Sequence, residues 1–115
     1  AATEDGGQPH VRPIGFVMEY NGGLAFYSDK RKNMYKQLMK NPKMEICALD
    51  EKFNTLRIKC EAEFITSEDS QKAAFAAMQK MGYAVGDGIF EIYTIKNPEI
   101  SFTSMVGKKL DGIEL

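Results

Sequence analysis

The 115-residue sequence falls within the usual size of one domain, so residues 1–115 are expected to form a single unit. Its formal net charge of −1 excludes a broad basic surface for nucleic acid, but it permits a local basic pocket for one phosphate. No apolar run approaches the length that spans a membrane, and the sequence carries no secretory signal. Two cysteines and one histidine make a poor set of metal ligands, so no metal is expected.

The two cysteines, Cys47 and Cys60, give the sequence no disulfide framework, which is typical of a reducing compartment. Both are expected to be buried strand residues, because free cysteine is among the most frequently buried residue types. Together with the missing secretory signal, this predicts a cytoplasmic protein.

Strand and turn signals fill the first part of the sequence. Residues 4–7 (Glu-Asp-Gly-Gly) indicate a tight turn, because Asp-Gly and Gly-Gly readily adopt positive φ. Residues 11–20 are rich in β-branched and aromatic side chains and predict a strand, in which Pro13 marks an edge or a bulge. Residues 21–23 (Asn-Gly-Gly) predict a hairpin turn to a return strand over residues 24–28.

Two helices are expected, each opened by a capping residue. Ser28 or Asp29 can cap the first helix, which Asn-Pro at residues 41–42 ends. Its apolar positions recur at helical spacing: Met34, Tyr35, Leu38 and Met39. Thr66 with Asp69 resembles a capping box for the second helix, and Gly82 is its expected stop. The apolar face of that helix consists of Ala73, Ala74, Ala77, Met78 and Met81.

Four further strands are expected. Residues 44–49 form a short apolar run suited to a buried strand. Residues 56–64 alternate strictly between apolar and polar side chains, which predicts a half-buried antiparallel strand. Residues 89–95 and 100–106 predict two more strands, joined by a turn at Asn97-Pro98.

The predicted order is therefore β-β-α-β-β-α-β-β, and a further strand is expected before Ala1. Hairpin connections predict a mostly antiparallel sheet. Six or more strands in so short a chain leave costly edges unless the sheet curls into a barrel. The predicted fold class is mainly β (α+β), an antiparallel barrel with two helices that plug or flank it.

An arginine in an apolar stretch is the first candidate for chemistry. Arg12 lies within residues 7–16, Gly-Gln-Pro-His-Val-Arg-Pro-Ile-Gly-Phe. An arginine inside such a strand usually needs a partner, and its planar fork suits a phosphate. The alternative is an ion pair with an acidic neighbour across the sheet.

Three cations at the expected start of the first helix are the second candidate: Lys30, Arg31 and Lys32. Cations at this end oppose the helix dipole and reduce helix stability unless an anion lies nearby. Free backbone N–H groups of the first turn, together with the lysines, could bind a phosphate. The alternative is a solvated basic face, but the placement against the dipole favours an anion site.

These pieces, in this order, resemble the pyridoxamine 5'-phosphate oxidase family. The Gly-Gln-Pro-x-x-Arg stretch that ends at Arg12 is similar to the family's phosphate-contacting strand. Phe-Tyr-Ser at residues 26–28, the basic helix start and Leu-x-x-Asn-Pro at residues 38–42 match the next strand and helix without a gap. Residues 56–64 fit the strand that follows in the family. Residues 88–93 and the Ser-Phe ending at residues 101–102 fit its small single-domain branch, which includes nitroimidazole-reductase-like proteins.

The resemblance implies a split barrel that forms a homodimer and holds flavin mononucleotide (FMN) at the subunit interface. It implies that Arg12 contacts the flavin phosphate. It further implies that Pro13 and Ile14 border the isoalloxazine ring, and that Tyr27 and Ser28 line the phosphate–ribityl side.

The remaining implied site residues depart from the family pattern. Lys32 and Asn33 stand where the family has its phosphate-binding serine and arginine. Thr55 takes the place of a glutamine that reaches the flavin. The family oxidase has a lysine at the position of Val17 and a second basic helix residue at the position of Met34. The C-terminal extension that binds pyridoxal phosphate is not present before the sequence ends, so true pyridoxamine 5'-phosphate oxidase activity is not expected.

The predicted function is that of an FMN-binding flavoprotein, an oxidoreductase of this family that acts on an unassigned small-molecule substrate. The alternatives are a non-enzymatic flavin-binding module, or a relative that binds deazaflavin or haem in the same fold. No catalytic side chain is assigned. His10, the only histidine, is expected at a turn or on a strand surface.

Overall fold

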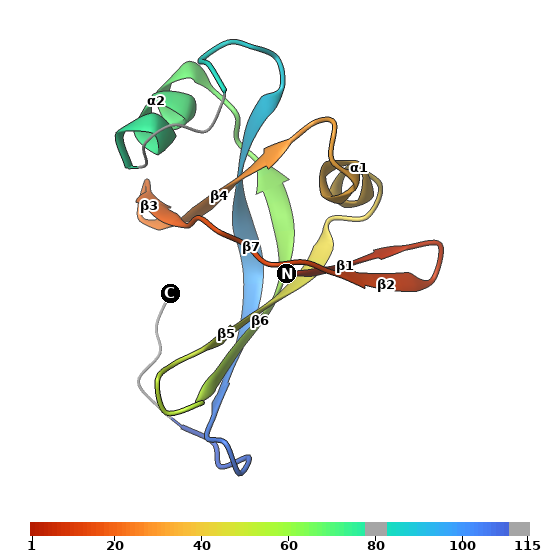
Figure 1. Ribbon diagram of the computed structural model, residues 1–115, viewed down its shortest axis with the longest axis vertical. Helices are drawn as coiled ribbons and strands as arrows, with labels where there is room; N and C mark the ends of the chain where they lie inside the picture. The colour runs from red at the N-terminus through yellow and green to blue at the C-terminus, as the bar shows by residue number, and fades with distance from the viewer. Residues whose placement is uncertain (78–82, 111–115) are drawn as a thin grey trace.

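The computed structural model describes residues 1–77 and 83–110, and within these ranges the chain forms one antiparallel sheet with two helices (Figure 1). The order of the seven strands across the sheet is β2-β1-β5-β6-β7-β4-β3. The strands are β1 (Ala2–Asp5), β2 (Gln8–Val11), β3 (Met18–Tyr20), β4 (Gly23–Asp29), β5 (Lys43–Leu49), β6 (Thr55–Phe64) and β7 (Phe90–Thr103). The helices are α1 (Asn33–Lys40) and α2 (Glu68–Ala77).

The two hairpin turns agree with the prediction. Gly6 and Gly7, with φ of 59° and 84°, join β1 to β2, and Asn21 and Gly22, with φ of 52° and 81°, join β3 to β4. The strand expected over residues 11–20 is instead two short strands, β2 and β3, with residues 12–17 between them. Pro13 has no backbone N–H with which to continue a ladder, so this stretch leaves the sheet and can border a cavity.

Each face of the sheet carries its own hydrophobic core, because alternate residues of a strand point to opposite faces. The core beside α1 consists of Phe26, Leu38, Met44, Ile58, Cys60, Ala62 and Tyr93. The core beside α2 consists of Met18, Ala25, Ala74, Phe90 and Ile92. Figure 1 accordingly shows α1 and α2 on different sides of the β4–β7 pair. The alternation predicted for β6 is confirmed, since its three core residues are two positions apart.

The last strand differs from the prediction. Residues 90–103 form one continuous strand, β7, instead of two strands joined by a turn. Between the pairs Lys59–Glu99 and Glu61–Lys96, β7 carries one residue more than β6, which makes a β-bulge. Pro98 lies in this bulge. It is tolerated there because β4 pairs only with the first part of β7, so beyond that part β7 needs donors for β6 alone.

Helix α1 begins later than predicted. Neither Ser28 nor Asp29 caps it, because β4 continues through Asp29 and the N-cap residue is Lys32, which makes no side-chain capping bond. The Asp29 carboxylate instead accepts the backbone N–H of Arg31 at 2.8 Å. The end of α1 agrees with the prediction, since its C-cap residue is Asn41.

Helix α2 begins with a different pair of residues from the predicted Thr66 and Asp69. Ser67 Oγ accepts the N–H of Ser70 at 3.0 Å, and Ser70 Oγ accepts the N–H of Ser67 at 2.8 Å. This is a reciprocal capping box shifted by one residue. The Thr66 hydroxyl accepts the N–H of Ile92 at 3.0 Å and so ties the helix start to β7.

The predicted apolar face of α2 is described only in part. Ala74 is buried, Ala73 is half-buried and Ala77 is exposed. The remaining positions lie outside the described residues: Met78, Met81 and the expected stop Gly82.

We expect Ser67→Ala to lower the free energy of unfolding by about 1 kcal/mol, because the N–H of Ser70 loses its acceptor. Urea denaturation of both proteins measures the difference. Ser101→Ala, which removes an exposed hydroxyl from β7, is the control and should stay within about 0.5 kcal/mol of the unmodified protein. Equal losses in the two variants would contradict the capping role.

Candidate functional site

A cavity of about 410 Å³ lies where residues 12–15 pass the end of β4 and the start of α1; we call it the polar cavity. Its lining residues are Arg12, Pro13, Ile14, Gly15, Tyr27, Ser28, Lys32, Asn33, Met34 and Tyr93. Of the site residues predicted from the sequence, all line this cavity except Thr55. The fold therefore brings together residues 12–15, residues 27–34 and Tyr93, which are distant from one another in the sequence.

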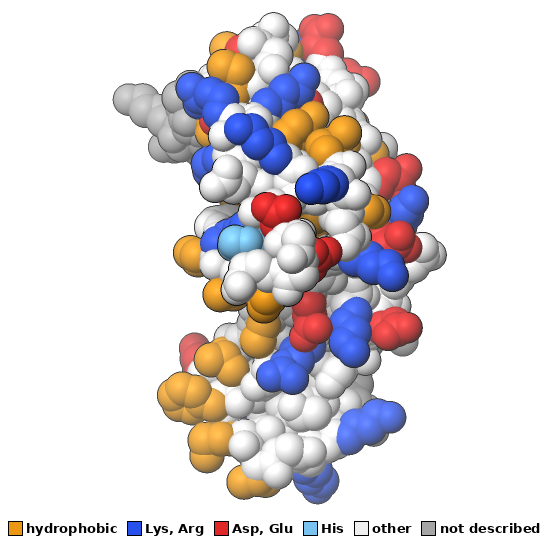
Figure 2. Space-filling model, turned by 90° about the vertical axis from the view of Figure 1, so that its right-hand side faces the viewer, with side chains coloured by type: hydrophobic (Ala, Val, Ile, Leu, Met, Phe, Trp, Pro, Cys, Tyr) orange, Lys and Arg blue, Asp and Glu red, His pale blue; other side chains and the backbone are white. Residues whose placement is uncertain are grey.

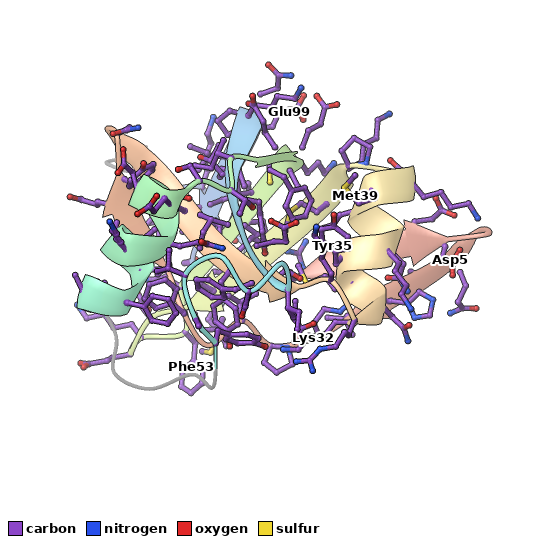
Figure 3. All side chains as sticks on the ribbon, turned by 90° about the horizontal axis from the view of Figure 1, so that it is seen from above. Asp5, Lys32, Tyr35, Met39, Phe53 and Glu99 are labelled. Atoms are coloured by element: carbon purple, nitrogen blue, oxygen red, sulfur yellow. The ribbon has the colours of Figure 1, made fainter. Side chains whose placement is uncertain are left out.

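The local structure explains how the strand end and the helix start meet. Strand β4 carries Tyr27 and Ser28 to its end, where they pair with Ile92 and Glu91 of β7. The chain then turns, and α1 begins directly after Lys32. Figure 3 shows Lys32 at this start of α1. Because the turn is short, the Ser28 hydroxyl and the Lys32 side chain both reach the same cavity.

The Arg12 guanidinium is held by two neutral side chains. Its Nη1 donates to Thr3 Oγ1 at 2.5 Å, and its Nη2 donates to Gln37 Oε1 at 2.9 Å. Within the described residues, no carboxylate makes an ion pair with Arg12 at 4.0 Å or less. The structure therefore does not show the acidic partner that was the alternative for this arginine, and its positive charge stays available to a ligand.

Two of the three cations at the helix start have carboxylate partners. Lys30 Nζ lies 3.2 Å from Glu91 Oε1, and Arg31 Nη2 lies 2.6 Å from Asp29 Oδ2. Lys32 Nζ instead lies over an aromatic ring of β4, 5.6 Å from its centroid. In the described part of the chain, Lys32 is thus the one cation of this turn without a carboxylate partner. The first N–H groups of α1 add the positive end of the helix dipole beside it.

Asp29 anchors the turn between β4 and α1. Its carboxylate is 2% exposed and accepts hydrogen bonds from Arg31 Nε at 2.9 Å and from the Tyr83 hydroxyl at 2.8 Å. The hydrogen bonds from Arg31 are the main cause that holds the pKa of Asp29 well below its usual range, although burial opposes them. Arg31 therefore fixes the turn and does not line the polar cavity.

Two buried hydroxyl groups line the polar cavity. Ser28 is 3% exposed and Tyr93 is 0% exposed, and both residues line this cavity. Burial raises the pKa of Tyr93, so this hydroxyl stays protonated and can donate. A hydroxyl group can both donate and accept a hydrogen bond, so both groups can bind polar atoms of a ligand. The sequence prediction missed Tyr93, because the sequence does not distinguish its hydroxyl from the neighbouring polar groups of the same strand, Glu91 and Thr94.

A second cavity, of about 540 Å³, shares residues 12–15 with the polar cavity. Its other lining residues are mostly apolar, and we call it the apolar cavity: Ala1, Val11, Phe16, Val17, Phe26, Ile46, Cys47 and Ala48. Residues 12–15 thus stand between a polar and an apolar space. This arrangement suits a ligand with a charged end and a planar apolar body.

Thr55 lies apart from both cavities. It begins β6, where it pairs with Leu49 of β5 and Thr103 of β7. Its predicted contact with a flavin stays a prediction. His10 is half-buried in β2, pairs with Thr3 of β1 and lines neither cavity.

The prediction that both cysteines are buried is right for Cys60 and wrong for Cys47. Cys60 belongs to the core beside α1, and burial raises the pKa of its thiol to about 11. Cys47 is exposed and lines the apolar cavity. The reason is that the end of the β5–β6 hairpin extends beyond the core, as Figure 1 shows, so side chains become exposed along β5.

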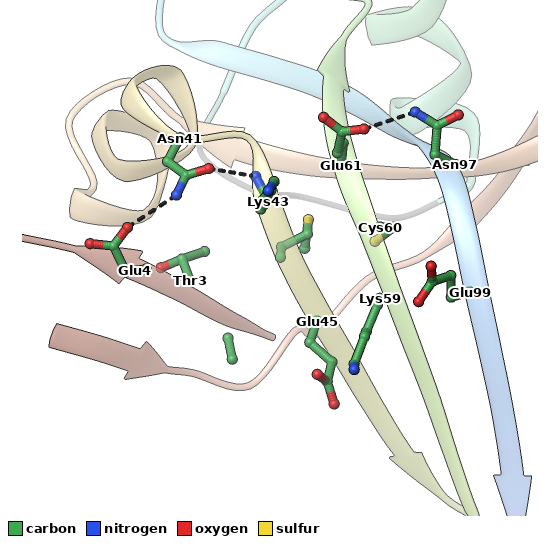
Figure 4. A pocket seen from close by; sticks show the side chains of 12 residues that line it. Thr3, Glu4, Asn41, Lys43, Glu45, Lys59, Cys60, Glu61, Asn97 and Glu99 are labelled. Atoms are coloured by element: carbon green, nitrogen blue, oxygen red, sulfur yellow. Dashed lines mark hydrogen bonds between the residues drawn. The ribbon is translucent and has the colours of Figure 1, made fainter. Parts of the chain in front are cut away.

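A hollow of about 590 Å³ on β1, β5, β6 and β7 carries charged side chains that face one another (Figure 4). Glu45 stands opposite Lys59, and Lys59 stands opposite Glu99. The Asn97 amide donates to Glu61 at 2.8 Å. Alternating charges across neighbouring strands are typical of a solvated sheet face, so this hollow is not the candidate site.

The described residues contain no group of three or more His, Cys, Asp or Glu side chains that could hold a metal ion. No helix found there is long and apolar enough to cross a membrane.

The stretches that line the two cavities also match a known family. The family model described as pyridoxamine 5'-phosphate oxidase matches residues 1–104. The chain belongs to this family. The match includes residues 12–15, the turn from β4 to α1 and all of β7, so both cavities lie within the family region. No curated protein matches the chain.

Solved structures agree with the family and with the predicted split-barrel fold. A NimC/NimA family protein from Clostridium acetobutylicum is 33% identical, with a TM-score of 0.88 over 95% of this chain and 78% of that chain. A Listeria innocua protein whose name proposes it to be a pyridoxamine 5'-phosphate oxidase is 16% identical. Its TM-score is 0.67 over 86% of this chain and 83% of that chain, which shows a shared fold.

We expect the Asp29→Asn variant to lose less stability than the unmodified protein as the pH falls. Since folding lowers the pKa of Asp29, its stabilising contribution is complete above its unfolded pKa of about 3.9 and disappears as the pH falls below that value. The thermal unfolding midpoint of the unmodified protein should therefore fall more between about pH 5 and pH 2 than that of the variant.

Glu63→Gln, which removes an exposed carboxylate of β6, is the control for this measurement. It should show the same acid profile as the unmodified protein. An Asp29→Asn profile parallel to that of the control would show that the Asp29 carboxylate does not anchor the turn.

Proposed function

We propose that the protein is a flavoprotein of this family that binds FMN and acts as an oxidoreductase on a small-molecule substrate. The observation that carries the proposal is the polar cavity. There, Arg12 and Lys32 have no carboxylate partner within the described residues, and two buried hydroxyls stand beside them. Such a cavity suits a phosphate group. The adjoining apolar cavity suits a planar isoalloxazine ring.

Each residue has its own part in this proposal. Arg12 and Lys32 bind the phosphate by charge, while the Ser28 hydroxyl and the backbone N–H of Asn33 bind it by hydrogen bonds. Residues 13–14 stand between the two cavities and border the ring. FMN, when bound, supplies the hydride-transfer chemistry.

The chain's own contribution is orientation and exclusion of water. The Tyr27 ring packs between Phe16, at 6.0 Å between centroids, and Phe90, at 5.8 Å, and so forms a rigid wall of the polar cavity. Among the described residues that line the apolar cavity there is no carboxylate and no imidazole. We therefore assign no side chain of this chain as a proton donor or acceptor.

The substrate is expected to differ from pyridoxamine 5'-phosphate. Val17, at the position where the family oxidase has a lysine, lines the apolar cavity and offers no charge to a substrate phosphate. The 33% identity to the NimC/NimA family protein supports a place in the small single-domain branch.

We further propose that a second copy of the chain completes the site. Val11 and Val17 both line the apolar cavity and are 83% and 54% exposed, so this cavity is open to solvent along an apolar rim. Figure 2 shows more apolar side chains gathered along the lower edge of the molecule. The exposed large apolar residues of the β5–β6 hairpin and of the segment after β7 are Leu49, Phe53, Met105 and Val106. A homodimer that covers these residues would close the cavity over a flavin ring.

We call the proposed phosphate-binding groups of Arg12, Ser28, Lys32 and Asn33 the phosphate cradle. If they bind the phosphate, FMN should bind much more tightly than riboflavin, which has the same ring and no phosphate. Fluorescence titration of the apo-protein measures both affinities. Arg12→Ala should weaken FMN binding roughly 10- to 150-fold, because a charge-assisted contact is lost, with a smaller effect on folding. Lys32→Ala should reduce the preference for FMN, and high salt should reduce it as well.

Lys36→Ala is the matched control, since it removes an exposed lysine from α1 that lines neither cavity. It should keep the preference of the unmodified protein. Similar affinities for the two flavins in the unmodified protein would rule out the cradle, and a preference for riboflavin would contradict the proposed function.

The homodimer predicts a sedimenting species of twice 12.9 kDa at micromolar concentration. Met105→Glu, which places a charge on the exposed apolar edge, should shift the equilibrium towards monomer and weaken flavin binding. Sedimentation velocity and flavin titration measure the two effects. A monomer in the unmodified protein, at concentrations where flavin binds, would exclude a site shared between subunits.

A further inference from the structure

We propose that Gln37 is a positioning residue that, with Thr3, holds Arg12 through neutral oxygen atoms and so preserves its positive charge for the phosphate of FMN. This inference rests on the proposed function and adds two residues to it that lie outside the polar cavity. Neither was predicted from the sequence. Gln37 occupies a buried position of α1, on the helix face where an apolar residue is expected, whereas the predicted Met39 is 59% exposed.

The hydrogen bonds between the three side chains form a closed triangle. The Thr3 hydroxyl donates to Gln37 Oε1 at 2.6 Å and accepts Arg12 Nη1 at 2.5 Å. Gln37 Oε1 also accepts Arg12 Nη2, at 2.9 Å. The three residues come from β1, from the stretch after β2 and from α1. Thr3 and Gln37 are 4% and 7% exposed, so the triangle is fixed in the protein interior.

The triangle determines which atom of the Gln37 amide faces Arg12. Two donors, one from Thr3 and one from Arg12, point at the same amide atom, so this atom must be the oxygen. Arg12 has five N–H donors, and these contacts use only two of them. The remaining donors can bind a ligand at the wall of the polar cavity.

The neutrality of the partners is the decisive property. A carboxylate at the same place would also hold the guanidinium, and in a buried position an ion pair of this kind is common. Its negative charge would then offset the attraction between Arg12 and a phosphate a few ångströms away. An apolar side chain at this position would leave the Thr3 hydroxyl and Arg12 Nη2 without their acceptor, so a polar group is needed here, and the amide supplies it without a negative charge. The amide is best explained as an orienting group that does not cancel the charge.

Gln37→Glu tests this inference, because it keeps the size of the side chain and adds one negative charge opposite Arg12. We expect the affinity for FMN to fall about tenfold or more, and the affinity for riboflavin to stay unchanged. The thermal midpoint of the apo-protein should stay the same or rise, because the variant gains an ion pair. A merely structural role for Gln37 would leave the ratio of the two affinities as in the unmodified protein.

Two further variants keep the test decisive if Gln37→Glu folds poorly. Thr3→Val removes the hydroxyl that orients Arg12 and should reduce the preference for FMN, whereas Thr3→Ser keeps the hydroxyl and should not. Met39→Glu places the same charge on the exposed side of α1 and controls for long-range effects. It should leave the preference unchanged.

The outcomes separate this inference from the proposed function. If the unmodified protein does not prefer FMN to riboflavin, both are overturned. If it prefers FMN and the preference survives in both Gln37→Glu and Thr3→Val, the cradle stands and the positioning role is overturned. Loss of the preference in Gln37→Glu and Thr3→Val, with Met39→Glu and Thr3→Ser unchanged, supports the positioning role.

Discussion

The pairing of β7 with β4 on one side and β6 on the other is the interaction on which the rest of the structure depends. It packs the Tyr93 ring against Phe26, at 5.4 Å between centroids, and against Phe64, at 5.5 Å. The Tyr93 hydroxyl is therefore fixed in the best-buried part of the sheet, because a close-packed interior leaves its ring no room to turn away. The same pairing sets the end of β4, and with it the place where α1 starts. These strands thus determine much of the shape of the polar cavity.

The local features of the site could be predicted from the sequence because each is an exception to a local rule. Arg12 is a charged residue in an apolar stretch, and Lys32 is a cation at the N-terminal end of a helix, where the helix dipole disfavours positive charge. Tertiary partners could not be predicted in the same way. In the sequence Gln37 is an ordinary helix residue. Its role arises only from the tertiary contacts of α1 with β1 and with the stretch after β2. The bulge that makes β7 one strand likewise depends on the register of β6, so Pro98 alone indicated a turn.

Charge is distributed at this site by pairing some cations and not others. Lys30 and Arg31 are held by Glu91 and Asp29, so they fix the turn between β4 and α1. Because that turn is fixed by its own ion pairs, its geometry does not depend on an external anion. The sequence does not distinguish the three adjacent cations, and only the fold shows that, among the described residues, Lys32 is the one without a carboxylate partner.

The bulge in β7 has a consequence for how copies of this protein meet one another in a crowded solution. Between its pairing with β4 and its bridge from Thr103 to Lys109, β7 has no strand partner on this side among the described residues, and an open edge can recruit a strand from another molecule. Pro98 interrupts the row of N–H donors along that edge, and the neighbouring Lys96 and Glu99 add charges to it. A strand from another molecule could therefore form neither a continuous ladder of hydrogen bonds nor an apolar contact along this edge. Pro98, which indicates a turn in the sequence, thus disfavours edge-to-edge aggregation in the folded protein.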